Sequence, residues 1–158
     1  MANQSAVGGR ICLDSGSLRK ALRTIDPDRI AVAYLGAAWR KYVNTATLKE
    51  IIVSPTLGSN PKAIEEAMQT LGIRNVHFLD QLHAKIYLGK EGALVSSCNL
   101  SENGFADRRL HEAGVHVTDA ENIIALNARF DALRALAKAQ YPTADSKRDA
   151  LRKLVELW

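Results

Sequence analysis

The chain alternates short apolar runs with segments of helical periodicity, and this alternation most constrains its fold. The run from Ile30 to Leu35 is almost entirely apolar and too short for a buried helix, so it predicts a buried strand. Further strands are expected at 51–53, 76–78, 82–88, 93–97 and 113–117. Strands that alternate with helices indicate an α/β domain, with a mixed sheet flanked by helices on both faces.

Capping residues mark where the helices should begin and end. Asp14 precedes an apolar stripe that runs to Ile25, and Asn60-Pro61 opens a second helix that Gly72 should close. Residues 120–158 are expected to form the C-terminal helices, interrupted near Tyr141-Pro142-Thr143, with Asp145-Ser146 as the cap of the last one.

The 158 residues suit one domain, which we place at residues 10–158 after a flexible tail at 1–9. The sequence contains no apolar stretch of the roughly 20 residues that a membrane span needs, and no secretory signal pattern, so a cytoplasmic protein without membrane contact is expected. Two distant cysteines, Cys12 and Cys98, are expected to be reduced. The formal net charge of +4 is compatible with a polyanionic partner.

Polar side chains of three successive predicted strands fall on single faces. With a period of two, His83, Lys85 and Tyr87 share one face, Ser97 and Asn99 share a face of the next strand, and Glu112 begins a third. Histidine can attack phosphorus, lysine and asparagine can stabilise developing charge, and glutamate can fix the tautomer of an imidazole. On alternation alone, the simpler interpretation is a solvated polar face.

Residues 82–105, LHAKIYLGKEGALVSSCNLSENGF, resemble the HKD signature of the phospholipase D superfamily, H-x-K, D, G-S-x-N. His83 and Lys85 match its first two positions, and Ser97 and Asn99 match its last ones, one residue early. Glu112 matches a glutamate that commonly follows. The resemblance extends over roughly residues 29–118.

Two positions depart from that signature. Lys90 stands where the family has aspartate, and Ser96 stands where it has glycine. We expect a tight turn around 89–92 to absorb the missing residue. Ser96 is expected to crowd the approach of a phosphate, because glycine lets the backbone come closer than serine does.

The resemblance implies a phosphodiesterase that needs no metal or cofactor. His83 would form a phosphohistidine, Lys85, Asn99 and Ser97 would grip the phosphate, and Glu112 would orient His83. Since the chain has one motif where the family's site needs two, a homodimer with a shared site is expected. Small members of the family are endonucleases, so a nuclease is implied, with DNA a more expected substrate than RNA.

Two other functions and several other residues stay open. The same site fits a lipid phosphodiesterase or phosphatidyltransferase, and the same fold fits a non-catalytic nucleic-acid-binding module. Candidate substrate contacts are Trp39, Arg40 and Arg109, which mix aromatic and cationic groups. His77, His111 and His116 are rival histidines, and a zinc site from His83, Cys98 and His116 is conceivable, although alternation turns Cys98 away from Asn99.

Overall fold

The computed structural model describes residues 8–158 and consists of a seven-stranded sheet with helices on both faces. The strands are β1 (Gly9–Cys12), β2 (Arg29–Val32), β3 (Glu50–Val53), β4 (Val76–Phe78), β5 (Ile86–Gly89), β6 (Gly92–Ser96) and β7 (Gly114–Val117). The helices are α1 (Ser15–Ile25), α2 (Pro61–Leu71), α3 (Glu102–Phe105), α4 (Ala120–Gln140) and α5 (Ala144–Leu157), with 3-10 turns η1 (Trp39–Lys41) and η2 (Ile73–Asn75). The predicted fold class, a mixed sheet between helix layers, is confirmed.

The sheet has the order β1-β7-β6-β5-β2-β3-β4. Strands β2, β3 and β4 are parallel to one another, and every other neighbouring pair is antiparallel. The junction between the two halves is the antiparallel pair β2–β5, in which Ile30 lies opposite Tyr87. Because β5 runs against β2, the start of β5 lies at the same edge of the sheet as the end of β2.

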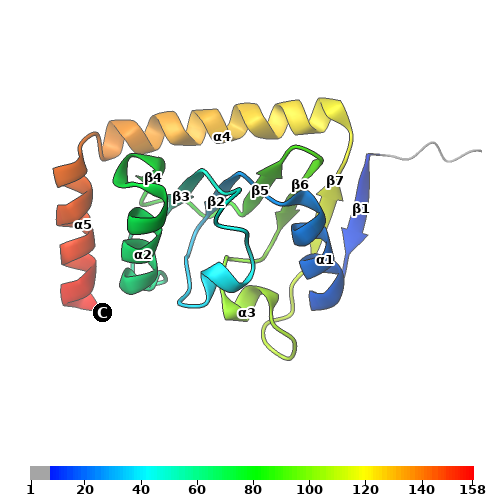
Figure 1. Cartoon of the computed structure of the whole chain (residues 1–158), viewed down its shortest axis with the longest axis horizontal. Coiled ribbons are helices and arrows are strands. Elements are labelled where there is room, and N and C mark those ends of the chain that lie inside the picture. The colour runs from blue at the N-terminus through cyan, green and yellow to red at the C-terminus, as the bar shows by residue number, and fades with distance from the viewer. Residues whose placement is uncertain (1–7) are drawn as a thin grey trace, which may run out of the picture.

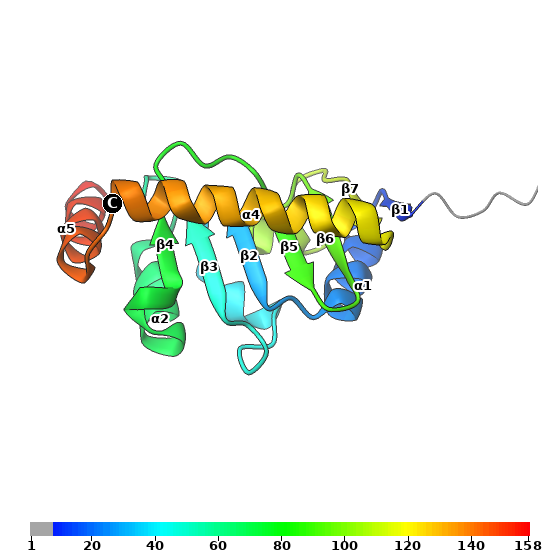
Figure 2. The ribbon, with the colours of Figure 1, turned by 90° about the horizontal axis from the view of Figure 1, so that it is seen from above.

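Two apolar cores fill the two sides of the sheet. Helix α4 crosses one face from β7 towards β4, as Figure 2 shows, and buries Phe130, Leu133 and Ala137 against it. Helices α1 and α2 cover the other face, and α5 stands beside α2 at one end of the molecule (Figure 1). The guanidinium groups of Arg29 and Arg134 also stack over the ring of Phe130, with their carbon atoms 5.3 and 5.8 Å from the ring centre.

The helix boundaries follow the capping residues with one exception. Asp14 accepts a hydrogen bond from the amide of Ser17, and Asn60 accepts from the amides of Lys62 and Ala63, as predicted for α1 and α2. Gly72 ends α2, with a φ of 87° that suits glycine. The predicted Asp145-Ser146 cap of α5 is wrong: Thr143 is the N-cap, in a reciprocal pair with Ser146.

The N-terminal boundary and two strand ends differ from the sequence prediction. Residues 1–7 of the expected tail lie outside the described residues, but Gly9 already belongs to β1, which pairs with β7. Strand β2 ends at Val32 rather than Leu35, because the next amides bond to side chains: Tyr34 donates to Asn99 Oδ1 and Leu35 to Ser59 Oγ. Strand β5 begins only at Ile86, so His83 lies in the extended segment before it.

Candidate active site

The sheet topology brings four chain segments to one edge. The end of β2, the segment before β5, the segment after β6 and the segment before β7 all lie there, since β5, β6 and β7 alternate in direction. These segments carry His83 and Lys85, Ser97 and Asn99, and Glu112. The expected convergence of the three successive segments is therefore present in the backbone.

His83 is exposed, and its imidazole is accompanied by the ammonium group of Lys85. Lys85 Nζ lies 3.3 Å from His83 Nδ1 and 3.4 Å from Nε2, so it sits between the two nitrogens and not in line with either lone pair. An ammonium group can only donate, and an unprotonated ring nitrogen of histidine can accept such a bond or act as a nucleophile.

Lys85 itself is 9% exposed. Burial lowers the pKa of this lysine, and the negative charge of nearby Glu112 opposes that shift. The largest cause is desolvation, so the carboxylate only partly compensates the buried charge. A phosphate entering this edge would supply the missing negative charge beside Lys85.

Asn99 is oriented by the backbone at the end of β2. Its Oδ1 accepts a hydrogen bond of 3.0 Å from the amide of Tyr34, which leaves the side-chain NH₂ group to donate elsewhere. The loop that carries Asn99 is held close to this segment, since Leu35 and Leu100 form a parallel bridge. Gly104 permits the close packing, because a Cβ there would overlap the carbonyl oxygen of Asn99.

Glu112 is tied to Ser97 in the structure. The Ser97 hydroxyl donates to Glu112 Oε2 and accepts from the amide of Ala113 at 3.0 Å. Among residues 8–158, no hydrogen bond links Glu112 to His83. The orienting role expected for Glu112 therefore stays a prediction, and the observed contact makes Ser97 a partner of that carboxylate.

Of the two departures from the signature, Lys90 lies away from the imidazole of His83, and Ser96 is accommodated in the sheet. Lys90 is exposed in a two-residue turn between β5 and β6, at the end of β5 opposite to His83, and this turn is as tight as predicted. Ser96 pairs with Gly114 of β7, where a Cβ would lie only 2.6 Å from Ser96 Cβ. The Ser96 hydroxyl accepts from the amide of Cys98 at 3.1 Å, so it supports the turn that leads to Asn99.

The predicted substrate contact at Trp39 is wrong. Trp39 is fully buried in the core, and its indole N–H donates to Glu66 Oε2 at 3.3 Å. Arg40 is exposed, but it reaches Thr70 near the end of α2, whereas the candidate site lies at the edge where α2 begins. The sequence prediction failed because a large aromatic side chain in a short 3-10 turn can pack into the core as readily as it can contact a nucleic acid.

Arg109 is nearer to the predicted catalytic groups. It is exposed and lines a cavity of about 210 Å³ that Glu112 and His111 also line. The backbone of Arg108 before it has a φ of 59°, a left-handed conformation that turns the loop.

His77, His116 and Cys98 do not join the candidate site. Cys98 is buried, and burial raises the pKa of its thiol to about 11. His77 lies in β4 and His116 in β7, each within a strand and not at the edge that carries His83. Cys12 and Cys98 are unpaired, as predicted. Within residues 8–158, no cluster of three or more histidine, cysteine or acidic side chains is arranged to hold a metal ion.

Two tyrosines shape this edge in ways that the sequence did not predict. Tyr34 contributes a backbone amide, which any residue could supply, so its identity carries no signal. Tyr87 was expected on the polar face but is fully buried, and its hydroxyl donates to the carbonyl of Cys98 at 2.8 Å. That hydrogen bond ties the segment that follows β6 to β5.

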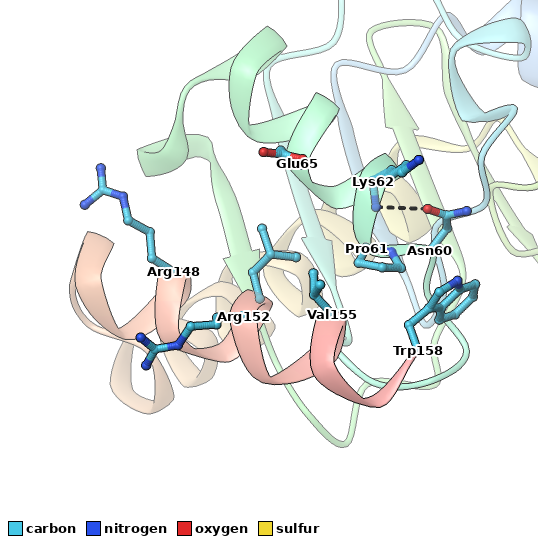
Figure 3. A pocket seen from close by; sticks show the side chains of 9 residues that line it. Asn60, Pro61, Lys62, Glu65, Arg148, Arg152, Val155 and Trp158 are labelled. Atoms are coloured by element: carbon cyan, nitrogen blue, oxygen red, sulfur yellow. Dashed lines mark hydrogen bonds between the residues drawn. The ribbon is translucent and has the colours of Figure 1, made fainter.

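A separate cavity of about 680 Å³ lies between α2 and α5 (Figure 3), and His83 is not among the residues that line it. It is bordered by Pro61, Val155 and Trp158 together with charged side chains of both helices. Asn60 at its margin accepts from the amide of Lys62, so its side chain serves the cap of α2.

In the part of the chain that the structure covers, no helix has both the length and the apolar character to cross a membrane.

Comparison with known proteins identifies the fold. No protein-family model and no curated protein sequence matches the chain. Among solved structures, it is similar to NucT from Helicobacter pylori, with a TM-score of 0.59 and 14% identity over 79% of this chain and 94% of that one. It is also similar to Nuc from Salmonella typhimurium, a phospholipase D family member, with a TM-score of 0.59 and 11% identity over 79% and 93%.

A third similar structure is the phosphatidylserine synthase of Haemophilus influenzae, with a TM-score of 0.58 and 12% identity, covering 93% of this chain but 42% of that one. At such low identities these comparisons concern the fold. The chain has the phospholipase D fold, as the sequence motif predicted.

Proposed function

We propose that this protein is a phosphodiesterase that cleaves nucleic acid through His83, without a metal ion. The observation that carries the proposal is the meeting of His83, Lys85 and Asn99 at one sheet edge, in a fold shared with a phospholipase D family member. These groups offer a nucleophile, His83, and two kinds of hydrogen-bond donor to the phosphate oxygens, the ammonium of Lys85 and the amide of Asn99.

In the first step, a His83 ring nitrogen attacks the phosphorus atom. A phosphorus–nitrogen bond forms, the bond to the leaving oxygen breaks, and a second histidine gives that oxygen a proton. In the second step, this histidine takes a proton from water, the resulting hydroxide attacks phosphorus, and the phosphorus–nitrogen bond breaks. Lys85 and the NH₂ group of Asn99 hold the non-bridging oxygens, with Glu112 and Ser97 as positioning residues.

The second histidine would come from a second copy of the chain. One chain carries one His83, and a twofold axis at this edge would place two copies of the same residue face to face. If active dimers exchange subunits freely, mixing equal amounts of wild type and the His83→Ala variant should leave about a quarter of dimers with both histidines. Activity per wild-type chain should therefore fall on mixing, whereas a site complete in one chain would show no change.

The test of the reaction is cleavage of single-stranded DNA, double-stranded DNA and RNA in excess EDTA. Wild type should cleave at least one of them, and His83→Ala should not. The variant His111→Ala is the matched control, because His111 is also an exposed histidine but lies outside the proposed chemistry. Equal cleavage by wild type and His83→Ala would refute the proposal, and so would activity that EDTA abolishes.

Transfer of a phosphatidyl group is the second candidate, favoured by the similarity to the phosphatidylserine synthase. The same histidine chemistry would act on a lipid phosphodiester. Incubation of the proteins with phospholipid vesicles separates the two: release of a lipid headgroup by wild type, without nucleic-acid cleavage, would replace the nuclease proposal. Inactivity towards both, with retained binding of DNA, would identify a binding module.

A further inference from the structure

A second candidate site lies along β4, the strand at the opposite end of the sheet from β1. A cavity of about 500 Å³ opens there beside the junction of α4 and α5. Its lining includes Arg74, His77, Lys138, Thr143, Ala144 and Lys147. Two strands, β2 and β3, separate β4 from β5, so β4 lies roughly 14 Å from the strand that follows His83, and His83 does not line the cavity.

His77 is the unusual member of this cavity. It is 2% exposed, and neither of its ring nitrogens has a hydrogen-bond partner among the described residues. The nearest acidic oxygen, Glu50 Oε2, is 3.8 Å from Nε2 and is already bonded to Arg134 at 2.9 Å. Buried polar groups are usually hydrogen-bonded, so an unpartnered imidazole in a cavity wall indicates a missing ligand.

The cavity also gathers positive charge without an acidic side chain in its lining. Lys147 is 7% exposed, and its ammonium donates to the carbonyl of Ile73 at 2.8 Å, which leaves two N–H groups for another acceptor. Arg74 and Lys138 are exposed at the margin. Desolvation, with the charge of Lys138 as a smaller cause, lowers the pKa of Lys147. Three cations around one hollow favour an anion.

The start of α5 adds to this preference. Thr143 and Ala144 line the cavity, and Thr143 is the N-cap of a helix of 14 residues. The first amides of a helix have no acceptor within it, and the helix dipole favours negative charge at that end. The helix end therefore reinforces what His77 and Lys147 indicate from their burial.

We propose that this cavity binds the phosphate group of a phosphorylated ligand, with Lys147, Arg74 and Lys138 as charged donors and a ring N–H of His77 as a further donor. The inference does not depend on the reaction proposed for His83. Two sources of such a group are a small phosphate monoester and the terminal phosphate of a nucleic-acid strand, which share the recognising chemistry.

Binding should depend on pH through His77. Burial, with smaller effects of Lys147, Lys138 and Arg134, lowers the pKa of His77 to about 4. The charged groups around its ring are Glu50 from β3, Arg134 and Lys138 from α4, Lys147 from α5 and Arg74 from η2. A bound phosphate favours the protonated ring, so it should raise the pKa of His77.

The test follows the His77 ring signals by NMR during titration with inorganic phosphate, at an ionic strength held constant with chloride. Phosphate should move these signals and raise the His77 pKa, and chloride alone should not. Lys147→Met should weaken binding at least about tenfold, as expected for loss of a charge-assisted hydrogen bond. Lys138→Gln, which changes an exposed side chain and leaves the core intact, should weaken it roughly two- to fivefold.

The matched control is Lys20→Gln, an exposed lysine of α1 at the other end of the sheet. It should bind phosphate as wild type does. The proposal is overturned if chloride moves the His77 signals as phosphate does, or if Lys138→Gln and Lys147→Met bind phosphate as tightly as Lys20→Gln.

The two sources are then distinguished in the His83→Ala background, which prevents cleavage by the proposed mechanism. One arm uses ribose 5-phosphate, and the other compares a short oligonucleotide with and without a 5′-phosphate. Competition of both phosphorylated probes with inorganic phosphate would support a general phosphate pocket. Competition by the phosphorylated oligonucleotide alone would support a strand-end site, and competition by neither would overturn the proposal.

Discussion

Asn99 should reveal whether this edge holds a phosphate, because its two amide atoms have separate tasks. Its Oδ1 accepts from the amide of Tyr34 at 3.0 Å, and its NH₂ group is the proposed donor to substrate. The Asn99→Asp variant keeps an oxygen for Tyr34 but replaces the donor by a negatively charged oxygen. The Asn99→Ala variant removes both atoms.

The expected magnitudes follow from that division. The unfolding free energy of Asn99→Asp should lie within about 0.5 kcal/mol of the wild-type value, since the acceptor for the Tyr34 amide is retained. Asn99→Ala leaves the amide of Tyr34 without its partner, which costs about 1 kcal/mol at a partly buried position and lowers the Tm by roughly 2–4 °C. Both variants should lose about 10²–10³-fold in cleavage rate, the effect of removing one donor to a developing oxyanion.

Thermal unfolding and cleavage of the preferred substrate measure the two effects separately. Asn99→Asp should be stable yet inactive, and Asn99→Ala should be both less stable and inactive. An Asn99→Asp variant with wild-type activity would refute the donor role. If Asn99→Ala were as stable as wild type, the bond to the Tyr34 amide would contribute nothing to the fold.

Three further expectations follow from buried groups. Lys85→Met should be more stable than wild type at pH 7 but inactive, because the pKa of Lys85 is lowered in the folded state and folding therefore opposes its charge at neutral pH. The unfolding free energy of wild type should approach that of the variant as the pH rises towards 10.5, which chemical denaturation at several pH values checks. The pKa of His77 falls from 6.5 to about 4, so the folded state should lose roughly 3 kcal/mol as the pH falls through this range, and His77→Phe should lack that loss in acid unfolding curves. Trp39→Ala should lower the unfolding free energy by about 3–5 kcal/mol, whereas the folded fraction should bind DNA as wild type does in a fluorescence titration. Weakened DNA binding by folded Trp39→Ala would restore the prediction that Trp39 contacts the substrate.

Much of the local structure could be predicted from sequence, because it depends on neighbouring residues. The apolar run that contains β2, the cap at Asn60 and the glycine end of α2 are short-range signals, and each appears in the structure. The spacing of His83 and Lys85 and the later Asn99 predicted the fold and indicated which residues should meet. The short turn at Lys90 also followed from counting residues against the motif.

Contacts between distant segments depended on the tertiary structure. Trp39 and Arg40 have the composition of a nucleic-acid contact, but the packing of η1 against α2 buries the first and carries the second away from His83. Periodicity placed Tyr87 on a polar face, yet the helices on that side of the sheet cover it.

The sequence by itself therefore determined the strands from β2 to β7, the long helices α1, α2, α4 and α5, the caps at Asp14 and Asn60, and the identity of the groups able to do phosphate chemistry. Only the tertiary structure decided that Asn99 bonds to the Tyr34 amide, that Glu112 meets Ser97, and that His77 lies among cations without a hydrogen-bond partner in residues 8–158. The physical reason is that periodicity and capping act over one or two turns of chain, whereas burial and charge are set by segments that only the folded sheet brings together.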